Sequence, residues 1–146
     1  DVDRGHQAPL ASFAGSRYWY EANYLSNITP QKSGLNQGAW KNLEERIRNT
    51  SSYYAPLYVI TGPIYDPEYN HVLPKADEEH KIPVGYFKLI YKSNGEHVAF
   101  KMSQDLDRNS DYCSQIVSYQ DLQGLARFDF PLLPKKGEGL KGDLGC

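Results

Sequence analysis

The sequence has few cysteines, no long apolar run and no excess of positive charge. Its 146 residues include only two cysteines, too few for the disulfide framework of a small secreted scaffold. No stretch approaches the roughly 18 apolar residues that a membrane-spanning helix needs. The formal net charge of -2 provides no overall basic field, so any contact with nucleic acid must depend on individual arginines and lysines.

The composition is typical of a globular chain. Hydrophobic residues make up 40% and charged residues 23% of the sequence, which excludes wholesale disorder. The length lies within the roughly 100–200 residues of a usual domain, so we expect a single domain over residues 1–146. The sequence begins at Asp1 rather than at methionine, and we therefore expect a mature or cut chain.

The two cysteines, Cys113 and Cys146, are candidates for a disulfide. The tail over residues 135–145 is rich in glycine and lysine and offers little apolar surface, so a covalent link would attach it to the rest of the protein. Two unrelated free thiols are the alternative. A disulfide would place the protein in an oxidising compartment, which means that it is secreted or periplasmic.

One helix is indicated by apolar residues that recur every four positions, namely Leu35, Ala39, Leu43 and Ile47. Ser33 precedes this pattern and is a candidate N-cap, and the polar residues 49–52 indicate the end of the helix.

The remaining pattern favours strands. Residues 57–61 form a β-branched and aromatic run that ends at Gly62-Pro63, which predicts a buried strand. Residues 85–92 and 97–102 flank Ser93-Asn94-Gly95, and Asn-Gly between two such runs predicts a β-hairpin. Weaker signals are a turn-rich segment over 7–34, a strand over 115–118 and a short helix over 119–127. The predicted class is α+β with an antiparallel sheet.

Arg4 and His6 are the first candidates for chemistry. In an extended segment the side chains at positions i and i+2 point to the same face. A guanidinium can bind phosphate oxygens, and an imidazole can accept a proton near neutral pH. The alternative is a surface arginine beside a structural histidine.

A second polar group lies in and before the predicted helix. Asn36 is at the helix start, and an asparagine oxygen is a hard neutral ligand that suits Mg²⁺. Glu44 lies about 12 Å further along the helix axis, so we expect it to act through metal-bound water. Arg48 is positioned to pair with Glu44 or to face phosphate. The alternative is a solvent-exposed helix face on which Glu44 and Arg48 form one ion pair.

A family resemblance joins these residues. The string Asp3-Arg4-Gly5-His6-Gln7-Ala8-Pro9-Leu10-Ala11 resembles the signature of the DNA/RNA non-specific endonucleases, which are ββα-metal (His-Me finger) nucleases. Residues 23–31, 35–40, 58–63 and 80–83 continue the match in order. The resemblance is dense over residues 1–65 and thinner after residue 93.

The resemblance implies a fold and a reaction. The fold would be an antiparallel sheet with a metal-bearing helix. The reaction would be Mg²⁺-dependent hydrolysis of phosphodiester bonds in DNA and RNA, with Mn²⁺ as a substitute ion and 5′-phosphate ends as products. Contacts limited to backbone phosphates explain a lack of sugar specificity. A homodimer is compatible with the family, and no membrane partner is expected.

The resemblance also implies roles for individual residues. His6 would be the general base that activates water, Asn36 the one direct protein ligand of Mg²⁺, and Glu44 the residue that holds metal-bound water. Arg4 and Arg48 would neutralise the phosphate as charge develops. The residues that would shape the site by hydrogen bonding are Asn23 and Asn27.

One departure from the family pattern concerns the start of the sequence. Family members usually have several strands ahead of the Asp-Arg-Gly-His motif, including part of the central sheet, whereas this sequence has two residues there. We therefore expect a missing N-terminal segment, a separate chain or a different arrangement of strands. The rival function is a non-catalytic remnant that binds nucleic acid or phosphate.

Overall fold

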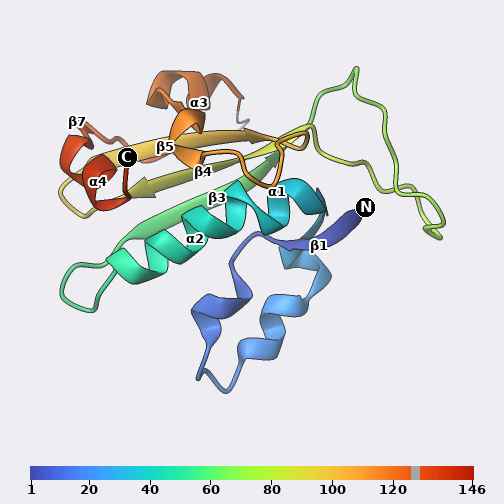
Figure 1. Ribbon diagram of the computed structural model, residues 1–146, viewed down its shortest axis with the longest axis horizontal. Coiled ribbons are helices and arrows are strands. Elements are labelled where there is room, and N and C mark those ends of the chain that lie inside the picture. The colour runs from blue at the N-terminus through green and yellow to red at the C-terminus, as the bar shows by residue number, and fades with distance from the viewer. Residues whose placement is uncertain (126–128) are drawn as a thin grey trace.

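A computed structural model describes residues 1–125 and 129–146 (Figure 1). The main sheet consists of β3 (Tyr58–Ile64), β4 (Gly85–Tyr91), β5 (Glu96–Ser103), β6 (Ile116–Val117) and β7 (Lys135–Lys136). The order β3-β4-β5-β6 is antiparallel throughout, and β7 pairs in parallel with the start of β5. No helix in the described part of the chain has the length and apolar character needed to cross a membrane.

A two-stranded antiparallel ribbon of β1 (Val2–His6) and β2 (Ile28–Lys32) leads into α1 (Ser33–Gln37) and α2 (Ala39–Thr50). This strand-strand-helix order is the predicted ββα unit, and the antiparallel sheets confirm the predicted α+β class. The other helices are η1 (Leu10–Phe13), η2 (Trp19–Asn23), η3 (Leu25–Asn27), η4 (Tyr112–Gln115), α3 (Tyr119–Leu125) and α4 (Glu138–Asp143).

The main sheet is covered on both faces, with α1 and α2 on one side and α3 on the other (Figure 1). Alternate side chains of the central strand β4 point to opposite faces, so Tyr86 and Ile90 pack toward α2 whereas Phe87 and Leu89 pack toward α3. Each fully buried large apolar side chain contributes about 1.5–3 kcal/mol to stability. The largest apolar residues that α1 and α2 contribute to this core are Leu35, Trp40, Leu43 and Ile47.

The β1–β2 ribbon is attached to the main sheet by hydrogen bonds to the backbone of β2. The buried Gln104 donates through Nε2 to the carbonyl oxygen of Pro30 at 2.8 Å and accepts the backbone N–H of Lys32 at 2.8 Å. Tyr86 donates through its hydroxyl group to the same Pro30 oxygen at 2.6 Å. These contacts fix the ribbon relative to β4 and β5.

The predicted single helix is instead two helices separated at Gly38. A Cβ at this position would lie 2.4 Å from the carbonyl oxygen of Arg108 and 2.5 Å from that of Gly34. Only glycine allows this close approach of the loop before η4. The predicted N-cap is also wrong: α1 begins at Ser33, and the Ser33 hydroxyl donates to Asp3 rather than capping a helix.

Strand β3 differs from its prediction in length and burial. It continues through Gly62 and Pro63 to Ile64, and its first residues, Tyr58 and Val59, are 45% and 40% exposed. Because β3 is the edge strand of the described sheet, one side is left without a strand partner and a proline is tolerated there.

Other predictions are confirmed in outline. The hairpin forms as β4 and β5, with Gly95 at a φ of 87° in the turn. The strand predicted over 115–118 is present as β6, and α3 fills the described part of the helix predicted over 119–127. Residues 126 and 127 of that prediction lie outside the described residues. The segment 7–34 is more regular than expected, because it contains η1, η2, η3 and β2.

The C-terminal tail is attached by a disulfide and by apolar packing. Cys113 and Cys146 form the predicted disulfide, with 5.4 Å between their Cα atoms. The expectation that the tail lacks apolar surface is wrong, because Leu140 and Leu144 of the α4 region are fully buried in the α2-side core. Tyr112 also donates a hydrogen bond to the carbonyl oxygen of Leu144 at 2.6 Å.

The disulfide leads to a stability prediction. Replacing both Cys113 and Cys146 by serine should lower the free energy of unfolding by about 3–4 kcal/mol, because the unfolded chain loses a closed loop. Denaturant unfolding of both forms measures this difference. Titration of the unfolded, unreduced wild type should find no free thiols, and finding two would contradict the pairing.

Candidate functional site

Strand β1 presents Arg4 and His6 two positions apart, on the same face of the strand as predicted. The intervening Gly5 is buried, and a Cβ there would lie 2.4 Å from Oε1 of Gln31 on the paired strand. Gly5 thus packs closely against Gln31 on one face of the ribbon, and Arg4 and His6 lie on the opposite face. Arg4 is exposed, and His6 is partly buried.

The imidazole of His6 is held by Asn23, the last residue of η2. Nε2 of His6 lies 2.9 Å from Oδ1 of Asn23. An amide oxygen only accepts hydrogen bonds, so Nε2 is the donor in this contact. This contact orients the imidazole of His6, and the predicted shaping role of Asn23 stays a prediction.

Asn27 acts on the backbone rather than on a side chain of the site. Its Nδ2 donates to the carbonyl oxygens of Ala8 at 3.0 Å and Ala22 at 2.8 Å, and its Oδ1 accepts the N–H of Ala8 at 2.8 Å. These hydrogen bonds of the Asn27 amide hold together the segment that contains η1, η2 and η3. Because η2 ends at Asn23, this closure supports the contact to His6.

Asn36 is oriented by Asp3, a residue that the sequence reasoning missed. Oδ2 of Asp3 accepts Nδ2 of Asn36 and Nε2 of Gln37, each at 2.9 Å, and Oδ1 accepts the Ser33 hydroxyl at 2.7 Å. Burial raises the pKa of Asp3, but these three hydrogen bonds together hold its pKa below the usual value. Asp3 therefore links β1 directly to α1.

Glu44 lies in the interface between α2 and the main sheet, where it meets a second residue that was missed. Oε1 of Glu44 has no hydrogen-bond partner and lies 3.6 Å from Nζ of Lys88, which is an ion-pair distance. Burial raises the pKa of Glu44, while the charges of Lys88 and Arg48, and that of His6 when it is protonated, act in the opposite direction. These three residues belong to β4, α2 and β1.

Lys88 is fully buried in the middle of β4. Burial lowers its pKa to about 8. A signal for it exists in the sequence, because Lys88 stands among the apolar and aromatic residues 86–91 of a predicted strand. By contrast, Asp3 is the first residue of the Asp-Arg-Gly-His string, but no spacing in the sequence indicates its partners, which lie 30 or more residues away.

The two candidate arginines are available to bind an anion. Within the described residues neither Arg4 nor Arg48 has an ion-pair partner at close distance. Arg48 is nevertheless near enough to Glu44 for its charge to lower the pKa of that carboxyl group. Both guanidinium groups therefore retain the capacity to bind phosphate oxygens.

The residues present fit a cation with few protein ligands. Among residues 1–125 and 129–146, no group of three histidine, cysteine, aspartate or glutamate residues is placed to hold a metal ion. Asp3 binds Nδ2 of Asn36, so the amide oxygen of Asn36 faces the opposite way and is free for a hard cation. Oε1 of Glu44 also has no hydrogen-bond partner, but it is buried beside Lys88.

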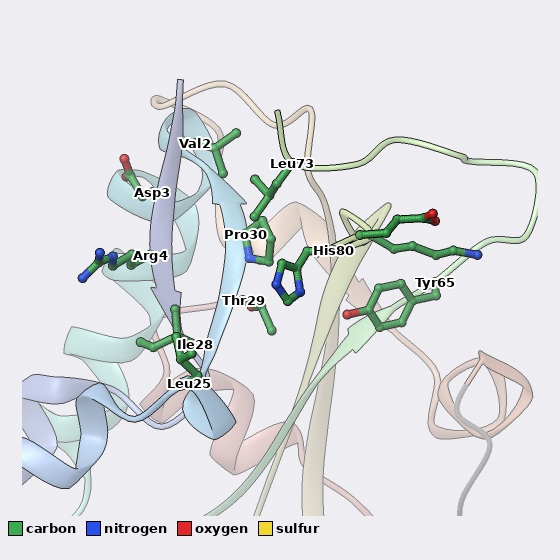
Figure 2. A pocket seen from close by; sticks show the side chains of 12 residues that line it. Val2, Asp3, Arg4, Leu25, Ile28, Thr29, Pro30, Tyr65, Leu73 and His80 are labelled. Atoms are coloured by element: carbon green, nitrogen blue, oxygen red, sulfur yellow. The ribbon is translucent and has the colours of Figure 1, made fainter. Parts of the chain in front are cut away.

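A pocket of about 440 Å³ adjoins Arg4, between the β1–β2 ribbon and the loop that joins β3 to β4 (Figure 2). Figure 2 shows Asp3 and Arg4 projecting from β1 on the side opposite Tyr65 and His80. The residues that line this pocket are Val2, Asp3, Arg4, Leu25, Ile28, Thr29, Pro30, Tyr65, Leu73, Glu79, His80 and Lys81.

Several known nucleases are similar to this chain in sequence. A nuclease from Serratia marcescens is 42% identical over 128 residues, which cover 84% of this chain and 48% of that protein. Human mitochondrial endonuclease G is 39% identical over 98 residues, covering 66% of this chain and 29% of that protein. A nuclease from a Nostoc species is 28% identical over 142 residues, covering 88% of this chain and 50% of that protein.

The chain thus spans half or less of the length of these relatives. A sequence model of the DNA/RNA non-specific endonucleases matches residues 1–135, which include every candidate site residue. The ββα unit and the Asp-Arg-Gly-His strand agree with that match, and this chain belongs to the DNA/RNA non-specific endonuclease family.

Proposed function

We propose that this chain, as a single domain, is an Mg²⁺-dependent endonuclease that hydrolyses phosphodiester bonds of DNA and RNA and leaves 5′-phosphate ends. Family membership supports the reaction class. The contact between Nε2 of His6 and Oδ1 of Asn23 carries the chemical part of the proposal, because it leaves Nδ1 of His6 as a positioned proton acceptor.

His6 acts as the general base in this proposal. Its Nδ1 takes a proton from a water molecule, whose oxygen forms a bond to phosphorus as the bond to the 3′-oxygen breaks. Asn23 keeps the imidazole in the tautomer that can accept this proton. The leaving 3′-oxygen takes up a proton from solvent, which completes the hydrolysis and leaves phosphate on the 5′ side.

Arg4 and Arg48 stabilise the negative charge that develops on the phosphate. Their guanidinium groups come from β1 and α2, so they approach the phosphate from two elements. Charge-assisted contacts of this kind strengthen as the oxygens gain charge in the transition state. Contacts restricted to phosphate also explain how a chain with a net charge of -2 can act on both DNA and RNA.

Asn36 holds the metal ion in this proposal, and Glu44 orders the water around it. When bound, Mg²⁺ supplies positive charge to the phosphate and to the leaving oxygen, and Mn²⁺ can substitute for it. Asp3 keeps the amide oxygen of Asn36 directed away from β1. Asn27 keeps η2 in place so that Asn23 reaches His6.

The disulfide supports export of this protein. A bond between Cys113 and Cys146 persists in oxidising compartments, so we propose that the chain is secreted or periplasmic.

The reaction class is tested with supercoiled plasmid DNA and with RNA. Both substrates should be cut in the presence of Mg²⁺, and EDTA should stop cleavage until Mg²⁺ is restored. A folded sample that binds these nucleic acids but does not cut them would instead support the non-catalytic binding remnant.

Replacing the proposed base should separate chemistry from binding. His6→Ala should lower kcat at least about 100-fold, because general-base catalysis is lost, while the dissociation constant for DNA changes little. Asn23→Ala should cause a smaller loss, since the imidazole remains but its tautomer is no longer fixed. The exposed His71, outside the site, provides a control: His71→Ala should leave kcat unchanged. Wild-type turnover in His6→Ala would exclude His6 as the base.

The metal ligand has a matched control on the same helix. Asn36→Ala should raise the Mg²⁺ concentration needed for half-maximal rate at least about 10-fold, as expected when metal binding is weakened. Gln37 also donates to Oδ2 of Asp3 at 2.9 Å, so Gln37→Ala removes an equal contact to Asp3 without removing the ligand. Equal Mg²⁺ titrations for the two variants would contradict the assignment of Asn36.

A further inference from the structure

Lys88 is a charged residue in a position that otherwise belongs to the core. Its neighbours on the same face of β4, Tyr86 and Ile90, are fully buried and pack against α2, and Lys88 itself is 0% exposed. Its ammonium group is therefore enclosed between the sheet and α2. A buried lysine is rare unless it is paired, so the contacts of this group indicate what it does.

Three contacts define the position of the ammonium group. Nζ donates to Oγ1 of Thr61 at 2.9 Å, across the β3–β4 pairing in which these two residues are opposite each other. It also lies 4.2 Å from the centre of the Trp40 ring. The third neighbour is Oε1 of Glu44 at 3.6 Å. The first two contacts anchor the charge, and the third directs it at the carboxylate.

Glu44 depends on this charge more than on any other. Its carboxylate is largely withdrawn from water, and Oε1 has no hydrogen-bond partner. The groups whose charge acts on it are Lys88 from β4, Arg48 from α2 and, when protonated, His6 from β1, and Lys88 has the largest effect of the three. Arg48 and His6 are at least partly exposed, whereas Lys88 has no access to solvent.

We infer that Lys88 is a positioning residue of the proposed reaction: anchored on Thr61 and Trp40, its buried ammonium group fixes the Glu44 carboxylate in place and in its charged form beside His6. The inference rests on the proposed function in that Glu44 is assigned to the water around the metal ion. Lys88 itself touches neither substrate nor metal, and it acts only through Glu44.

This role differs from that of a simple core contact. A residue that only packs should affect activity through stability, independently of the identity of residue 44. A residue that acts through Glu44 should lose its effect once the carboxylate is removed. A double-mutant cycle distinguishes these cases, because it measures whether two substitutions are coupled.

The cycle uses Lys88→Met, Glu44→Gln and the double variant. Methionine keeps a long unbranched side chain over Trp40 and removes the charge. Lys88→Met should lower kcat about 10- to 100-fold with little change in KM, as is typical when a supporting partner of a metal site is lost. In the Glu44→Gln background the same change should have almost no further effect. Ile90→Val, on the same strand and face, should leave kcat unchanged.

A second readout does not require activity. The carboxyl carbon of Glu44 is followed by ¹³C NMR through an acid titration of the metal-free protein. Removing the Lys88 charge leaves the carboxylate buried without its strongest cation, so the midpoint in Lys88→Met should move to higher pH. Arg48 and His6 remain in place, so the change in the midpoint of the Glu44 titration is limited. Where Lys88→Met does not fold, Thr61→Val tests the anchor instead and should lower kcat in the same direction by a smaller factor.

Equal losses of kcat from Lys88→Met in the wild-type and Glu44→Gln backgrounds would show a structural role and overturn the inference. An unchanged NMR midpoint would overturn it as well. Absence of cleavage by the wild type is a separate result: it removes the proposed function, and the NMR titration alone then decides whether Lys88 controls the charge of Glu44.

Discussion

The ion pair between Lys88 and Glu44 joins the packing of this molecule to its chemistry. Withdrawing two charges from water costs several kcal/mol for each ion, and their attraction offsets this cost only in part. Contacts with Thr61 and the Trp40 ring reduce the deficit without turning the pair into a major source of stability. The apolar residues around it supply that stability, at about 1.5–3 kcal/mol for each fully buried large side chain. The pair therefore fixes the geometry of the α2–sheet interface but contributes little to its stability.

The candidate site is divided between two units that dock separately on the same sheet. The β1–β2 ribbon carries His6 and is attached through Gln104 and Tyr86, whereas α2 carries Glu44 and is attached through the core. Asp3 links the ribbon to α1, the helix that precedes α2, because it lies on β1 and binds side chains of α1. The position of His6 relative to Asn36 thus depends on the attachment of the ribbon to the sheet and on the hydrogen bonds of Asp3.

The parts of the structure that could be predicted from the sequence are those set by local patterns. The Asn94-Gly95 turn and the apolar period of the helix each follow from a few neighbouring residues, and both are present. The break at Gly38 could not be predicted, since it depends on the distant backbone of Arg108. The roles of Asp3 and Lys88 were missed for the same reason. Their partners come from other elements, and a charged residue near an end or within a strand has no spacing that reveals its partner.

The break between α1 and α2 has a consequence for how the site can vary. In one continuous helix, the separation of Asn36 and Glu44 would be fixed by helical geometry. Here the two residues lie on different helices, and the Arg108 carbonyl sits against the junction at Gly38. Changes in the loop before η4 can therefore alter the spacing between the Asn36 amide and the Glu44 carboxylate while every residue of the candidate site stays the same. If the two residues act on one metal ion as proposed, this loop can adjust the selectivity among divalent ions without contributing a residue to the site.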